Sequence, residues 1–172
     1  MSTPLAATDY PAYAKRYIDL VPEEDIIAGL EKQGRETCAL LRSLSEEKAA
    51  SRYAPDKWSI KTVVRHFTDA ERIFGYRALA IARGDKNSLP GFEENDYAAA
   101  SDADLLRMRD LADEYESVRR STVAFYRGLS PEAWKRTGTA NNSPATVRGL
   151  AYTTLGHERH HLKVLRDKYD VR

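Results

Sequence analysis

The sequence predicts an all-α protein built as a four-helix bundle. Four long segments repeat apolar residues at the spacing of one helix face, and shorter polar connections join them. No stretch alternates like a strand over a useful length. A chain of 172 residues suits one domain with its own core. We therefore expect a lead-in segment over 1–21, whose tyrosines pack onto the body, and a single bundle domain over 22–172.

The first two helices are predicted over about 22–44 and 60–83. Pro22 suits the first turn of the earlier helix, and the acidic residues that follow it complement the positive end of a helix. Ser59 suits the N-cap of the later helix, and Gly84 follows its last apolar residue. Each segment is long enough to span a small bundle.

The third and fourth helices are predicted over about 102–128 and 145–169. Ser101 or Asp102 suits the cap of the third, and the polar run 141–144 reads as a loop before the fourth. The order of long helices and short connections is typical of a four-helix bundle.

The two halves of the chain resemble each other faintly, which suggests two helical hairpins related by a pseudo-twofold axis. A Leu-Ser-x-Glu pattern at 44–47 precedes Trp58, and a Leu-Ser-Pro-Glu pattern at 129–132 precedes Trp134. Between the halves, the turn-rich loop Phe92–Tyr97 has two aromatic residues, so we expect it to cover part of the body.

Composition excludes several classes of protein. The formal charge of +1 provides no general field for nucleic acid or an anionic membrane. No apolar run approaches the roughly 18 residues of a membrane span, and the start Met1–Leu5 lacks the pattern of a signal peptide. A single cysteine, Cys38, excludes an internal disulfide and a multi-cysteine zinc site. We expect a cytoplasmic protein.

Three of the four histidines lie within five residues, His157-Glu158-Arg159-His160-His161. At about 100° per residue, His157 and His161 fall on the apolar side of the fourth helix and His160 falls off it. His66 lies beside the apolar stripe of the second helix. Alone, His66 would be interpreted as a hydrogen-bonded core residue. Together, the three imidazoles predict a metal site with open coordination positions.

The same five residues match H-E-x-x-H, in which the glutamate of a zinc protease acts as general base. Only 11 residues follow His161, and none is His, Glu or Cys, so a third protease ligand is missing. Glu158 is the candidate catalytic residue, either as a base or as a residue that orients a metal ligand. It points inward on the helical wheel, so it needs a buried partner if it stays charged. We interpret Asp69 and Glu71 as solvated helix charges rather than supports for the metal ligands.

Three pieces of the chain together resemble the DinB-like proteins. These pieces are Lys57-Trp58-Ser59-Ile60-Lys61 with His66 five residues on, Pro90-Gly91-Phe92-x-x-Asn95-x-Tyr97, and Gly156-His157-Glu158-x-His160-His161. The resemblance runs from about residue 23 to 169. DinB-like proteins are small bacterial four-helix metalloproteins related to mycothiol-dependent maleylpyruvate isomerases and thiol S-transferases.

The resemblance implies an up-down-down-up bundle, frequent homodimers, and a divalent ion, typically zinc or nickel, held by His66, His157 and His161. It also implies a low-molecular-weight thiol that reacts with a small electrophile. We expect the ion to favour the thiolate and the electrophile to lie near the Phe92–Tyr97 loop. Cys38, in mid-helix, is poorly placed as nucleophile. A non-catalytic metal-binding stress protein and a hydrolase that uses Glu158 remain alternatives.

Overall fold

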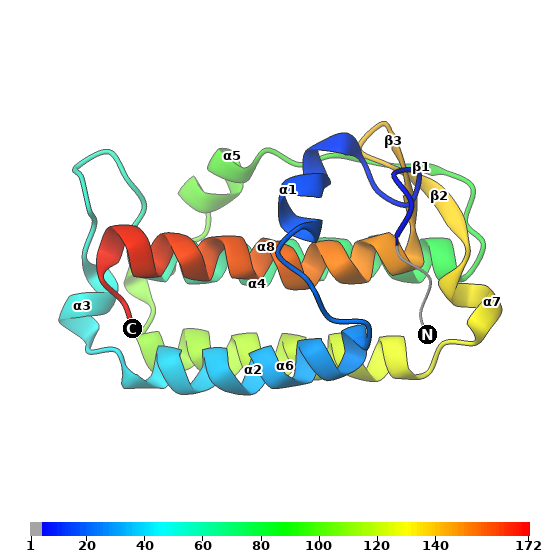
Figure 1. Ribbon diagram of the computed structural model, residues 1–172. Coiled ribbons are helices and arrows are strands. Elements are labelled where there is room, and N and C mark those ends of the chain that lie inside the picture. The colour runs from blue at the N-terminus through cyan, green and yellow to red at the C-terminus, as the bar shows by residue number, and fades with distance from the viewer. Residues whose placement is uncertain (1–4) are drawn as a thin grey trace.

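The computed structural model describes residues 5–172, and four long helices form its body (Figure 1). They are α2 (Ile26–Ser43), α4 (Ile60–Ala82), α6 (Met108–Arg127) and α8 (Val147–Tyr169). Helices α4 and α6 run in the same direction, and α2 and α8 run in the opposite one. This is the expected up-down-down-up order. The parallel pair α4 and α6 requires a long connection, which spans 83–107.

Side-chain caps fix where three of these helices begin. Asp25, Ser59 and Thr146 each accept a hydrogen bond from the backbone N–H three residues later, at 2.9–3.0 Å. The cap at Ser59 agrees with the prediction. The predicted start of the first helix near Pro22 is wrong by about one turn, because Asp25 satisfies the free N–H groups of the helix further along the chain.

The start of the third helix also differs from the prediction. Asp102 adopts a left-handed conformation with φ of 51° and precedes a single 3-10 turn, η2 (Ala103–Leu105). Helix α6 starts only at Met108, so neither Ser101 nor Asp102 caps it. Leu105, at 82% exposed, belongs to no core stripe.

The shorter elements connect the long helices and cover them. The helical ones are η1 (Ala12–Ala14), α1 (Lys15–Ile18), α3 (Glu46–Ala50), α5 (Glu94–Ala99) and α7 (Pro131–Trp134). The chain also forms a small sheet in the order β1-β2-β3, from β1 (Ser88–Leu89), β2 (Thr137–Ala140) and β3 (Ser143–Thr146).

The sheet corrects the expectation of a chain without strands. Strands β2 and β3 pair antiparallel, and β1 pairs parallel with β2. The predicted loop 141–144 is in fact the hairpin turn and the first residues of β3. Asn141 and Asn142 have φ of 50° and 56°, a left-handed turn that asparagine tolerates well. Strands of two to four residues are too short to show a period in sequence.

The interior of the bundle has three layers along its length. An apolar cluster lies at each end. One cluster includes Leu30, Ile81, Tyr126 and Leu155. The other includes Leu41, Phe67, Tyr115 and Leu165. Between them, all four helices contribute buried polar side chains: Thr37, His66, Glu71, Arg119, His157 and Glu158. The candidate site therefore lies at mid-height in the bundle, where its charges are farthest from both ends.

The lead-in segment, of which residues 1–4 lie outside the described part, lies along α8. Tyr17 is 5% exposed and packs onto the bundle, whereas Tyr13 faces solvent. Two glycines allow this close approach, because a Cβ on Gly149 would meet the Asp9 carbonyl and one on Gly156 would meet the Tyr17 carbonyl. None of the described helices is long and apolar enough to cross a membrane.

We expect Gly156→Ala to push the segment that contains Tyr17 away from α8. The new methyl group would overlap the Tyr17 backbone, which cannot rotate away as a side chain can, so the loss of stability should be about 1–3 kcal/mol. Chemical denaturation measures this loss. The matched control is Gly75→Ala in α4, where nothing lies within 4 Å of the added Cβ. That variant should be neutral or up to about 1 kcal/mol more stable. Equal effects of the two substitutions would contradict the close approach.

Candidate metal centre

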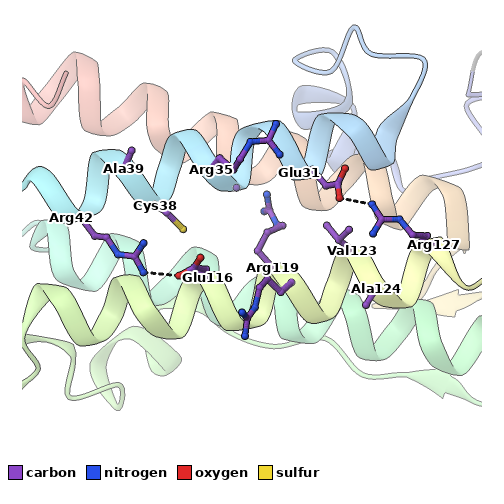
Figure 2. A pocket seen from close by; sticks show the side chains of 12 residues that line it. Glu31, Arg35, Cys38, Ala39, Arg42, Glu116, Arg119, Val123, Ala124 and Arg127 are labelled. Atoms are coloured by element: carbon purple, nitrogen blue, oxygen red, sulfur yellow. Dashed lines mark hydrogen bonds and ion pairs between the residues drawn. The ribbon is translucent and has the colours of Figure 1, made fainter.

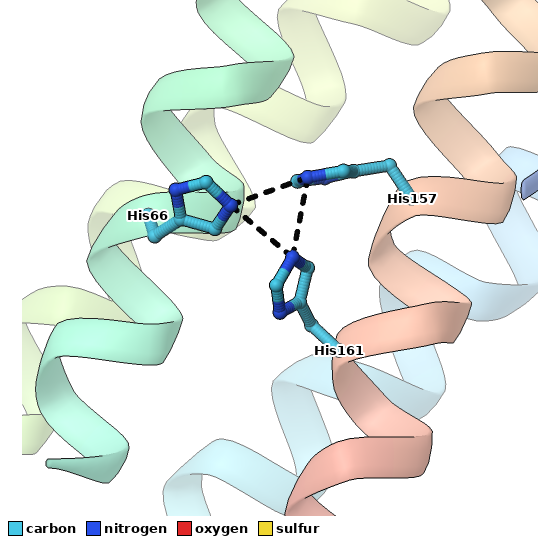
Figure 3. Close-up of side chains that lie close together, drawn as sticks. All are labelled: His66, His157 and His161. Atoms are coloured by element: carbon cyan, nitrogen blue, oxygen red, sulfur yellow. Dashed lines mark hydrogen bonds between the residues drawn. The ribbon is translucent and has the colours of Figure 1, made fainter. Parts of the chain in front are cut away.

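Three imidazoles from two helices converge in the middle layer (Figure 3). His66 projects from α4, and His157 and His161 project from α8 one helical turn apart. The Nε2 atom of His66 lies 3.2 Å from that of His157 and 3.1 Å from that of His161. The Nε2 atoms of His157 and His161 are 3.2 Å apart. The three Nε2 atoms therefore form a nearly equilateral triangle.

This triangle has the dimensions of a set of metal ligands. With a metal–nitrogen distance of about 2.0–2.1 Å, neighbouring nitrogens are about 3.3 Å apart around a tetrahedral ion and about 2.9 Å apart around an octahedral one. The measured 3.1–3.2 Å lies between these values. The three Nε2 atoms would hold a divalent ion through nitrogen donors alone. One or more coordination positions would then face away from the protein ligands.

Hydrogen bonding alone does not explain the triangle. A neutral imidazole has at most one hydrogen on Nε2 and otherwise presents a lone pair there. Three Nε2 atoms at mutual hydrogen-bonding distance therefore cannot all be satisfied by one another. A cation that accepts all three lone pairs would remove this conflict.

Burial keeps the three imidazoles neutral, which is the form that binds metal. Burial lowers the pKa of His66 to about 4. For His161, burial and the neighbouring His66 lower the pKa to about 2. The pKa of His157 is lowered for the same reasons, burial first. The ligand set is thus ready to bind a cation at neutral pH without first losing protons.

Aromatic rings surround the imidazoles. Tyr17 from α1 contacts His157 edge-on with the ring centroids 5.1 Å apart, and Phe74 contacts the same imidazole at 5.5 Å. The ring of Trp58 lies 5.0 Å from that of His66. These contacts restrict the rotation of the imidazoles, so their direction toward a common point is built into the packing.

His160 does not join the triangle, as the helical wheel predicted. Its ring packs against Tyr17 with centroids 5.5 Å apart, on the outer side of α8. It is half-buried, and burial lowers its pKa below the usual value.

Glu158 points inward, and its buried partner is Arg119 of α6. One carboxylate oxygen accepts hydrogen bonds from the hydroxyls of Thr37 and Tyr115, both at 2.6 Å, and the other accepts from Arg119. Burial alone would raise the pKa of Glu158, but the Arg119 guanidinium and the two hydroxyls hold it below its usual value. Both oxygens of this carboxylate therefore already have protein partners.

The guanidinium of Arg119 also binds Glu71, which corrects the expectation that Glu71 is a solvated charge. Two hydrogen bonds of 2.9 and 2.8 Å join the pair, and both side chains are buried. Asp69, by contrast, pairs with Arg65 and Arg72 near the surface. Sequence reasoning missed Arg119, although it lies four residues after the buried Tyr115 and so on the inward face of its helix.

A cavity of about 250 Å³ borders the triangle at His161. Its walls include His161, Trp58, Asn95 and Tyr169. A small molecule in this cavity would lie beside His161, the one imidazole of the triangle that lines it. The predicted cover from the Phe92–Tyr97 loop corresponds partly to α5, which contributes Asn95 to this wall.

A cavity of about 560 Å³ lies elsewhere, between α2 and α6 (Figure 2). Exposed ion pairs join Arg42 to Glu116 and Arg127 to Glu31 across it. Cys38 lies on its wall, and burial raises the pKa of this thiol, which opposes thiolate formation. The geometry of Cys38 thus agrees with the expectation that it is a poor nucleophile.

Comparisons with known proteins give the family and the fold. The family model of the DinB superfamily matches residues 30–165. No curated protein matches the sequence. The chain is similar in structure to YfiT from Bacillus subtilis, described as a probable metal-dependent hydrolase with an unusual four-helix bundle topology. The TM-score is 0.67 at 13% identity, over 96% of this chain and 93% of YfiT.

A second similar structure is a mycothiol-dependent maleylpyruvate isomerase, with a TM-score of 0.65 at 13% identity. The match covers 84% of this chain but only 61% of the isomerase. At 13% identity, the two similar structures support the fold of this chain and not its activity. Because the family model covers most of the sequence, the chain belongs to the DinB superfamily.

Proposed function

We propose that the protein binds a divalent metal ion through His66, His157 and His161 and uses it in a thiol-dependent reaction of the S-transferase or isomerase type. The observation that carries the proposal is the triangle of Nε2 atoms, 3.1–3.2 Å on each side, beside a cavity that opens at His161. Neutral nitrogen donors suit zinc or nickel. Accessible coordination positions suit a reactive centre rather than a closed structural one.

The chemistry requires a thiolate, and the chain's own thiol is poorly suited to supply it. A bound divalent ion would supply the positive charge that favours the thiolate of a small thiol at neutral pH. Cys38 lies on another face of the bundle with its pKa raised by burial. The imidazoles would hold the ion, and Trp58 and Asn95 would line the path of the incoming molecules.

Hydrolysis is the second candidate, because YfiT is described as a probable metal-dependent hydrolase. That chemistry would need a base near the ion to take the proton of the attacking water. Glu158 is the carboxylate nearest in sequence, but both its oxygens are bound by Arg119, Thr37 and Tyr115. We therefore propose that Glu158 positions α8 rather than acting as a base.

A non-catalytic metal-binding stress protein is a further alternative, and the cavity beside His161 counts against a closed site. We also propose a cytoplasmic location, where small thiols stay reduced. The homodimer that the family resemblance suggests stays a prediction.

We expect His161→Ala to lose the metal ion. Removal of one of three nitrogen donors should weaken metal affinity by about 100-fold or more, since even supporting residues change it by about 10- to 100-fold. Elemental analysis of the purified protein measures the metal content. His160→Ala is the matched control, because its ring lies outside the triangle. Equal metal content in the two variants would contradict the ligand assignment.

We expect the metal-loaded protein to catalyse replacement of chloride by a thiol sulfur in 1-chloro-2,4-dinitrobenzene. A panel of small thiols, followed by absorbance, tests the reaction. Chelation and His161→Ala should both abolish the catalysed rate, and Cys38→Ala should leave it unchanged. If every thiol gives only the uncatalysed rate while 4-nitrophenyl acetate is hydrolysed in a metal-dependent way, the hydrolase alternative replaces this proposal.

We expect Glu158→Gln to lower stability while the metal stays bound. Breaking a buried ion pair costs about 3–5 kcal/mol, because Arg119 loses a compensating charge. Glu31→Gln, which breaks an exposed pair with Arg127, should cost only about 0–1 kcal/mol. Denaturation and elemental analysis together measure both effects. A Glu158→Gln protein of unchanged stability but strongly reduced turnover would instead indicate a general base.

A further inference from the structure

Arg77 of α4 is a buried cation for which residues 5–172 provide no counterion. Its side chain belongs to a residue only 4% exposed, and no carboxylate of the described residues lies within ion-pair distance of it. The guanidinium donates one hydrogen bond, of 2.7 Å, to the Pro90 carbonyl and lies 6.0 Å from the centroid of the Phe92 ring. Arg119, the other deeply buried arginine discussed above, binds two carboxylates.

Such a charge is costly unless something compensates it. A guanidinium has five N–H donors, and within the described chain Arg77 uses only the donor that binds Pro90. Burial lowers the pKa of Arg77, and the nearby Tyr13 phenol acts in the opposite direction without reversing the shift. The Pro90 carbonyl and the Phe92 ring carry no net charge, so they do not neutralise the guanidinium.

Arg77 lines a cavity of about 310 Å³ between α4 and the 89–97 segment. The other lining residues are mostly apolar or aromatic: Ile73, Tyr76, Leu89, Pro90, Phe92 and Tyr97. Ligand pockets usually measure about 300–1,000 Å³ and combine apolar walls with a few polar groups. This cavity is at the lower end of that range, so it suits a small molecule.

We propose that this cavity binds the carboxylate of a small aromatic or apolar organic acid. Arg77 provides the counterion, since a guanidinium matches a carboxylate with two parallel hydrogen bonds. Phe92 and Tyr97 provide the walls against which the apolar part of the acid packs.

The charge of the cavity favours a single negative charge over a phosphate. Arg72 also lines the cavity, but it is already paired with Asp69 and Glu114. Arg77 is thus the only lining cation of the described residues without an acidic partner. One guanidinium without an acidic partner neutralises a monoanion, whereas a dianion would keep an uncompensated charge.

The site is separate from the metal centre although the two are neighbours. Helix α5 divides them, because Asn95 lines the cavity at His161 and Tyr97 lines the cavity at Arg77. Along α4, Phe74 contacts His157 and lies three residues before Arg77, about 4.5 Å along the axis. Binding of the acid requires none of the three histidines.

Titrations with benzoate and its neutral isostere benzamide, followed by protein NMR, test the proposal on the full-length protein. We expect benzoate to bind at least about tenfold more tightly than benzamide, since hydrogen bonds to a charged partner are the stronger ones. Arg77→Gln should remove this preference, and Arg77→Lys should restore part of it. Arg72→Gln, on the same cavity wall, is the matched control and should change benzoate affinity by less than about twofold.

His161→Ala should leave benzoate binding unchanged, so this result is independent of the metal proposal. If Arg77→Gln fails to fold, Tyr97→Ala replaces it, because Tyr97 is 51% exposed and its loss should weaken benzoate binding without disturbing the core. Equal binding of benzoate and benzamide, no binding of either, or tighter binding of inorganic phosphate than of benzoate would each overturn the proposal.

Discussion

The middle layer of the bundle depends on compensation of buried charge. Arg119 from α6 is held between Glu71 of α4 and Glu158 of α8, and the Thr37 hydroxyl from α2 completes the network. All four long helices thus contribute to one set of hydrogen bonds. A shift of α8 by one residue would separate the buried Glu158 carboxylate from Arg119, and an unpaired buried carboxylate is strongly unfavourable. The network therefore fixes the height and rotation of α8. Because His157 lies on the same helix, the position from which its imidazole projects follows from that of α8.

The separation into two apolar ends and a polar middle explains how the chain tolerates such a site. Burial of apolar side chains in both end clusters provides the stability that an unpaired set of imidazoles would reduce. Close packing around the imidazoles, with Tyr17 on one side and Trp58 on another, then prevents them from turning away from one another. Because the imidazoles are packed on their other sides, the cavity beside His161 is small, about 250 Å³. A ligand has a route to the imidazoles without loss of the packing that directs them.

Local patterns in the sequence were enough to predict the four helices and the inward direction of His157 and His161, because both follow from the helical period. The partners of Glu158 were not predictable in this way. Thr37 is 121 residues away and Arg119 is 39, so their contact depends on how the helices pack. Glu71 was misinterpreted for the same reason, since a charged residue is usually exposed and only a distant arginine makes its burial possible. The hairpin at Asn141 was not predicted, because its strands are too short to show an alternating pattern in the sequence.

Arg119 and Arg77 are both buried arginines, but they differ in whether the described residues provide a counterion. The carboxylates beside Arg119 come from the protein itself, and the interaction is complete within the bundle, so its role is structural. At Arg77 the protein offers a carbonyl oxygen and an aromatic face, and the remaining side borders a cavity. A fold that needed only to anchor the 89–97 segment could do so with an uncharged donor at lower desolvation cost. A retained positive charge among apolar walls is better explained by a bound anion from outside the described part of the chain.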